Sequence, residues 1–149
     1  MTHKIFKTTD LVELFNLAYL GVIEQGKPSV VPNAHEFDCA YHGENGEKCG
    51  IGHCLTNEAL EKVGSFIGDV SAMLGEFDYD DGFTDFEEFN RSNDFDTFLM
   101  GLQQCHDKAE IEVGNNADSL FIAQFKQNMM QFAIKTFPKR TFDVNHGIL

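Results

Sequence analysis

The stretch "CAYHGENGEKCGIGHCL", residues 39–55, carries three of the four cysteines and two of the six histidines of this 149-residue chain. Asn45-Gly46 near its middle is a strong turn signal and predicts an antiparallel β-hairpin over residues 38–53. A two-stranded hairpin is marginal by itself and needs a buried face. The stretch therefore predicts a hairpin packed against the rest of the fold.

Two turn geometries would give this hairpin two different registers. With a two-residue loop, His42 opposes Cys49, and Cys39 and Cys49 lie on opposite faces. With residues 44–46 as a three-residue loop, Tyr41 opposes Cys49, and Cys39 joins both on one apolar face. We favour the second register because it supplies the buried face. It predicts that Cys39 and Cys49 are buried thiols that behave as small hydrophobic residues.

Helical periodicity predicts most of the remaining structure. Asp10 is a candidate N-cap with Glu13 three residues later, and Pro138 stops the last helix. Helices are predicted over residues 10–25, 56–74, 94–108 and 118–137, where apolar residues recur at three- and four-residue spacings. The expected fold class is α+β, mainly α, with about four helices and one small antiparallel hairpin in a single compact domain, residues 1–149.

A metal site is the first alternative for the cysteine-rich stretch. Its residues include five ligands of the kind that zinc binds, namely Cys39, His42, Cys49, His53 and Cys54. Paired C-x-x-C knuckles, which make zinc motifs specific, are missing. The same absence argues against a redox pair. We therefore expect thiols in a structural role, no bound metal and no cofactor.

The charge of the chain is concentrated in one segment. The net charge is −13, and residues 76–96 hold nine acids and one arginine, which gives −8. A field of this sign repels nucleic-acid phosphates and attracts a basic protein surface. The expected partner-binding residues belong to an acidic insertion over residues 76–93: Glu76, Asp78, Asp80, Asp81, Asp85, Glu87 and Glu88.

Aromatic residues are interleaved with these acids, at positions 77, 79, 83, 86 and 89. They would serve as apolar anchors beside the carboxylates in a recognition surface, or they would turn inward as core residues. The acids themselves would then be a recognition surface in the first case and a solvating patch in the second. The sequence leaves both readings open.

Several functional classes are excluded or disfavoured by the sequence. If Gly82 were the turn glycine of a calcium loop, Phe77 and Tyr79 would stand where carboxylate ligands belong. Neither a G-x-S-x-G elbow nor an H-E-x-x-H helix is present. No apolar run reaches the roughly 18 residues of a membrane span, and the start has no signal-peptide pattern. We expect a cytoplasmic protein that is not an enzyme and does not bind a membrane.

His106-Asp107 is the remaining pair with chemical potential, since a histidine beside a carboxylate can act as a general base. Adjacent residues on a helix diverge, and His106 falls on the same face as Phe95, Leu99 and Leu102. The pattern is more typical of a buried histidine whose ring nitrogen bonds to backbone. We expect His106 to brace the predicted hairpin.

These motifs resemble those of a known family. The pattern comprises Cys39, Tyr41, Gly46, Cys49 and Gly52, followed about fifty residues later by Gln103, His106 and Asp107. It is similar to C-x-Y-R-G-x-x-G-x-K-C-A-x-G and L-Q-x-x-H-D in a family of small uncharacterised proteins of bacteria and their phages. This chain departs from the family at His42 and Gly50, and its insertion is longer and more acidic. The resemblance implies the hairpin-plus-helices architecture and a bacterial or phage setting, and it implies no reaction.

Three functional hypotheses follow. The first is a phage-encoded acidic module that binds a basic surface of a host protein, as an inhibitor or a nucleic-acid mimic. The second is a metal- or thiol-dependent enzyme that uses Cys49, His42 or His106. The third is a structural or assembly factor whose acidic patch only solvates the surface.

Overall fold

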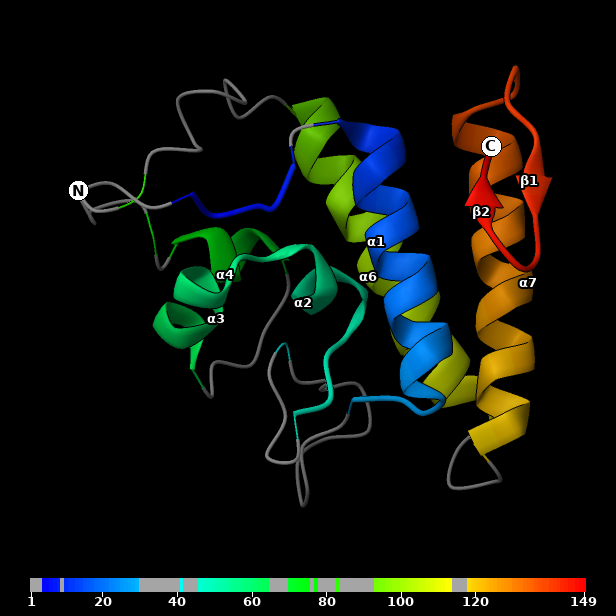
Figure 1. Ribbon diagram of the computed structural model, residues 1–149, viewed down its shortest axis with the longest axis horizontal. Coiled ribbons are helices and arrows are strands. Elements are labelled where there is room, and N and C mark those ends of the chain that lie inside the picture. The colour runs from blue at the N-terminus through cyan, green and yellow to red at the C-terminus, as the bar shows by residue number, and fades with distance from the viewer. Residues whose placement is uncertain are drawn as a thin grey trace.

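A computed structural model describes residues 4–8, 10–29, 41, 46–64, 70–75, 77, 83, 93–113 and 118–149. Within these residues the fold is α+β and mainly α, as predicted, with one small two-stranded antiparallel sheet (Figure 1). The elements in chain order are α1 (Leu11–Gln25), α2 (Gly50–Cys54), α3 (Asn57–Val63), α4 (Val70–Gly75), α6 (Asn93–Val113), α7 (Asp118–Thr136), β1 (Phe142–Asp143) and β2 (Gly147–Ile148).

Helix α1 has the ends that the sequence predicts. The Asp10 carboxylate accepts a hydrogen bond from the Glu13 N–H at 2.9 Å. Glu13 does not complete a reciprocal capping box, because its carboxylate accepts a 2.6 Å bond from the Thr8 hydroxyl instead. Gly26 ends the helix in the left-handed conformation at φ 79°, where glycine carries no steric cost.

The predicted helix over residues 56–74 is wrong as a single element. Helix α3 starts at a Thr56 cap and ends at Gly64, whose φ of 53° cannot continue a right-handed helix. Helix α4 then begins at Val70. The two C-terminal helices agree better: α6 extends the predicted 94–108 to Val113, and α7 matches the predicted 118–137 to within one residue.

The predicted hairpin over residues 38–53 is also wrong in its second half. Residues 50–54 form helix α2, so Cys49 and Ile51 are not on a β-strand. The physical reason is a cap: the Cys49 sulfur accepts a 3.4 Å hydrogen bond from the Gly52 N–H, which starts a helical turn. Residues 39, 40 and 42–45 lie outside the described residues. The observed hairpin is elsewhere, where β1 and β2 pair antiparallel.

Helix α2 packs against two of the long helices. It contacts both α1 and α6, and α7 contacts α6 along much of its length (Figure 1). The start of α2 lies close to α1 and α6, since a Cβ at Gly50 would be in van der Waals contact with the Ala18 Cβ at 3.4 Å and the Leu102 carbonyl oxygen at 3.6 Å. A hydrophobic core fills the space around these helices. No helix in the described parts of the chain is long and apolar enough to span a membrane.

The C-terminal hairpin is fastened to α1 by two side chains. The Asn16 amide makes a paired contact with Ile148, donating to its carbonyl at 3.0 Å and accepting from its N–H at 2.8 Å. The Tyr19 hydroxyl donates to the Val144 carbonyl at 2.7 Å. A side chain at Gly147 would clash with the Asn16 amide, so this turn needs glycine for space as well as for its φ of 86°.

Candidate functional site

The family-like motif residues that the structure describes gather around α2 and α6. Tyr41 is completely buried, and its hydroxyl accepts a 2.8 Å hydrogen bond from the Gln103 amide on α6. The amide oxygen of Gln103 in turn accepts a 3.1 Å bond from the Val70 N–H at the start of α4. A single glutamine therefore ties Tyr41 and α4 to α6, and both polar ends of its side chain are used.

Glycine at position 52 is required by the packing of Tyr41. A Cβ at Gly52 would clash with the Tyr41 carbonyl oxygen and would lie 2.9 Å from the Lys48 Cβ. Since a backbone oxygen cannot rotate away as a flexible side chain can, any substitution would force the chain segments apart. Gly52 thus belongs to the motif for its size. Gly46, the other motif glycine, has a φ of 83° and open space around it.

His106 is fully buried on the inner face of α6. Its Nε2 accepts a 3.0 Å hydrogen bond from the backbone N–H of Ser29, and its Nδ1 lies 3.1 Å from the Asp107 carboxylate. An acceptor Nε2 carries no proton, so Nδ1 holds the ring proton and donates it to Asp107. The ring also meets the edge of Phe121, with centroids 5.2 Å apart. His106 bonds to backbone as expected, and it braces the segment before the motif.

This arrangement holds the chain together, and the three cysteines that the structure describes are all buried. Burial raises the pKa of the Cys49 thiol to about 12, with a further rise from the Asp107 charge. Burial also raises the pKa of the Cys54 thiol, and that of Cys105 to about 12. A nucleophilic cysteine needs a thiolate and access to substrate. These three thiols have neither, so they act as small apolar groups.

The zinc candidates do not converge in the described residues. The Cys54 thiol donates to the carbonyl oxygen of Leu14 at 3.2 Å, which points its sulfur toward α1. The His53 ring lies against Gly21 of α1. Among the residues that the structure describes, no three histidine, cysteine or carboxylate side chains are grouped to hold a metal ion. Cys39 and His42, the other two candidates, lie outside those residues.

Between residues 76 and 92, the acidic segment is described only at two aromatic positions. Phe77 is buried and makes an edge contact with Phe83, with ring centroids 4.9 Å apart. Phe83 is half-buried and packs against the core. Of the five interleaved aromatic residues, these two turn inward and so are not apolar anchors for a partner. The other three aromatic residues lie outside the described residues, and so do all the expected partner-binding acids, which are Glu76, Asp78, Asp80, Asp81, Asp85, Glu87 and Glu88.

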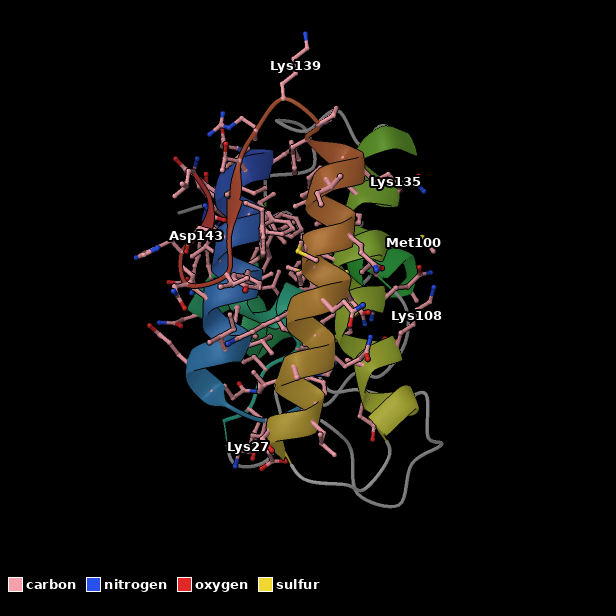
Figure 2. All side chains as sticks on the ribbon, turned by 90° about the vertical axis from the view of Figure 1, so that its right-hand side faces the viewer. Lys27, Met100, Lys108, Lys135, Lys139 and Asp143 are labelled. Atoms are coloured by element: carbon pink, nitrogen blue, oxygen red, sulfur yellow. The ribbon has the colours of Figure 1, made fainter. Side chains whose placement is uncertain are left out.

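Two hollows mark the described surface. The α1 pocket, of about 610 Å³, is lined by Lys7, Thr8, Glu13, Asn16, Leu17, Leu20, Gly21, Glu24 and His53. The α6–α7 groove, of about 540 Å³, lies along the seam of those helices and includes Met100, Lys108 and Lys135. Figure 2 shows Met100 and Lys108 on one side of α7, with Asp143 of the hairpin on the other.

Sequence reasoning did not find either hollow. The α1 pocket depends on pairing between residues about fifty positions apart, since Phe6 and Leu55 form an antiparallel bridge that brings Lys7 to the end of α2. The sequence contains one local signal of the α1 pocket. Gly21 in the interior of α1 costs helix stability, and such a glycine often marks a neighbour that approaches closely.

Comparison with known proteins adds no relative: no protein-family model, no curated protein and no solved structure matches this chain.

Proposed function

We propose that the chain is a small acidic protein-binding module, and that its residues 76–96 engage a basic surface of a partner protein. The observation that carries the proposal is that the polar groups of the motif form hydrogen bonds inside the protein. The Tyr41 hydroxyl, the Gln103 amide and the His106 ring nitrogens form such bonds, and Cys49 is buried with a raised pKa. The motif therefore builds a scaffold, and the largest remaining chemical feature is the charge of −8 in 21 residues.

The scaffold is attached to the acidic segment on both sides. Phe77 is buried in the core near its start. Phe95 is buried near its end, where it meets the edge of Phe6 with ring centroids 5.7 Å apart. Acids held between two core anchors lose less entropy on binding than acids on a free tail would. This favours a recognition role over a purely solvating one.

The resemblance of the motif to small bacterial and phage proteins extends the proposal. A phage-encoded module in the bacterial cytoplasm would meet host proteins with basic nucleic-acid-binding grooves. Closely spaced carboxylates can stand in for phosphates at such a groove, so we propose inhibition by nucleic-acid mimicry as the mode of action. The net charge of −13 is consistent with this and opposes direct nucleic-acid binding.

The test uses two variants with equal net charge. In the segment variant, Asp80 and Asp81 become Asn, and Glu87 and Glu88 become Gln. In the control variant, four exposed acids of the helices are neutralised in the same way: Glu24, Glu58, Glu61 and Asp118. Immobilised wild type first captures partners from a bacterial lysate at low salt, and a purified captured protein is then measured by surface plasmon resonance.

The proposal predicts slower association for the segment variant alone. Because exposed charges mainly steer encounter, the difference should shrink as salt rises and screening shortens to about 10 Å at 0.1 M. Equal association rates for wild type and both variants would mean that the acids only solvate the surface. Equal loss in both variants would show dependence on net charge without a recognition segment. Either result would overturn the proposal.

A further inference from the structure

The α1 pocket joins parts of the chain that are distant in sequence. The Lys7 N–H donates to the Cys54 carbonyl at 2.9 Å, and the Thr56 N–H donates to the Ile5 carbonyl at 3.0 Å. These bonds hold residues 5–7 beside the end of α2. Lys7 and His53 therefore line the same pocket, and Leu17 and Leu20 of α1 add apolar surface to its lining.

Among the residues that line the pocket, His53 is the one whose side chain has a buried polar atom without a hydrogen-bond partner. Its Nε2 is buried and has no hydrogen-bond partner. The ring is fixed against α1, because a Cβ on Gly21 would clash with the ring carbon Cγ. A buried polar atom without a partner costs free energy, and folded proteins leave few of them. Since the ring lines the pocket, a ligand bound there would supply the missing partner.

The charges around His53 are cationic. Its pKa is lowered to about 4 by burial, then by the charges of Lys48, Lys7 and His106. Burial, and next the charge of Lys7, lower the pKa of Lys48 as well. Two ammonium groups thus raise the local potential in a protein of net charge −13. Within the described parts of the chain, neither lysine forms an ion pair with a carboxylate.

The backbone of Lys48 is also fixed in place. The Gln25 side chain accepts a hydrogen bond from the Lys48 N–H at 2.8 Å and donates to its carbonyl oxygen at 3.1 Å. The pocket is also lined by two carboxylates, Glu13 and Glu24. Neither is among the charges that shift the His53 pKa, whereas Lys48 and Lys7 are. An anion would therefore find uncompensated positive charge at the His53 end of the pocket.

We propose that the α1 pocket binds the anionic group of a small molecule, a phosphate or a carboxylate, through the Lys7 ammonium and the His53 ring. Lys48 adds positive charge without lining the pocket. Leu17 and Leu20 receive the apolar part of the ligand. This inference is independent of the proposed recognition role of residues 76–96.

The test follows the backbone amides of Lys7 and Gly21 and the ring of His53 by NMR, with inorganic phosphate and acetate titrated separately at constant ionic strength. We expect saturable shifts at all three groups with at least one of these anions. Lys7→Gln should weaken binding about tenfold, since a charge-assisted contact contributes on that scale. Lys108→Gln makes the same charge change in the α6–α7 groove and should leave the affinity unchanged.

His53→Leu separates a binding role from a structural one. It removes the unpaired nitrogen, so the melting temperature should hold or rise while anion binding is lost. Three outcomes would overturn the proposal: shifts that do not saturate with either anion, equal binding by Lys7→Gln and wild type, or shifts that centre on the amides of the α6–α7 groove. Binding of phosphate without acetate would assign the site to phosphorylated ligands, and the reverse would assign it to carboxylates.

Discussion

His106 and His53 lie on neighbouring elements of the same core, and their surroundings are opposite. His106 is fully buried, with Nε2 bonded to the Ser29 backbone and Nδ1 to Asp107. His53 is half-buried at the edge of a pocket, and its Nε2 has no partner. The difference teaches that a structural histidine is identified by the hydrogen bonds of its ring nitrogens together with its burial.

The same criterion divides the molecule. Where buried polar atoms form hydrogen bonds with each other, as Tyr41 and Gln103 do, the residues specify the fold. Where a buried polar atom has no hydrogen-bond partner and nearby lysines form no ion pair with a carboxylate, a ligand would supply these interactions. The largest feature outside this comparison is the acidic segment, which we propose acts by charge.

The largest effect is expected from His106→Ala. The change leaves a cavity beside Phe121 and removes the His106 acceptor of the Ser29 N–H, so the free energy of unfolding should fall by about 3 kcal/mol. Urea denaturation measures it. His146→Ala is the matched control, since that ring is exposed and bonds only to Asp143 among the described residues, and it should cost less than about 0.5 kcal/mol. Equal losses of stability in His106→Ala and His146→Ala would contradict the structural role of His106.

Gly52→Ala should come next. The new Cβ clashes with the Tyr41 carbonyl oxygen, and overpacking of this kind costs about 1–3 kcal/mol. Gly75→Ala in α4 makes the same chemical change in open space, so stability should hold or rise slightly. Thermal unfolding of the pair tests whether the motif glycine is needed for space. A stable Gly52→Ala protein would argue against a tightly packed motif.

Cys49→Ala should lose about 1–2 kcal/mol, because the removed sulfur is small and its cap to Gly52 is weak. Cys49→Asp should lose more, since it buries a charge without a partner. Thiol labelling of the native protein should be slow at Cys49, Cys54 and Cys105, all of them buried. Rapid labelling of these three without unfolding would contradict a structural role.

The last effect appears only at acid pH and concerns His53. Its folded pKa of about 4 lies below the ordinary 6.5, so the unfolded chain binds the proton more readily between these values. The stability contribution of neutral His53 is therefore complete above pH 6.5 and declines as the pH falls toward 4. His53→Leu should lack this part of the acid sensitivity, which urea denaturation at a series of pH values would show. Identical pH profiles would place the His53 pKa near its ordinary value.

The sequence predicted those parts of the fold whose signals are local. Asp10 and Gly26 delimit α1, and Pro138 follows α7, because caps and breakers act on their own neighbours. The predicted hairpin over residues 38–53 was wrong because Asn45-Gly46 indicates a turn between two strands, whereas the Cys49 sulfur caps a helix. In the sequence, a cysteine whose sulfur caps a helix cannot be distinguished from any other cysteine.

Long-range pairing explains the other failures. The C-terminal hairpin is held by Asn16, 132 positions from its partner Ile148, and no local pattern announces that contact. The α1 pocket likewise depends on the Phe6–Leu55 bridge. For the candidate site, the sequence placed Tyr41, Gln103 and His106 in one motif, but the spacing could not show the hydrogen bonds that their polar groups make inside the protein.

The contrast between the two histidines is tested most directly by NMR of the Ser29 amide in ¹⁵N-labelled protein. An N–H···N hydrogen bond transmits a scalar coupling between its two nitrogens. The structure predicts such a coupling from the Ser29 amide to His106 Nε2 at neutral pH, with the ring proton on Nδ1. A proton found on His106 Nε2, with no coupling to Ser29, would contradict the structural assignment of His106 and return it to the candidates for catalysis.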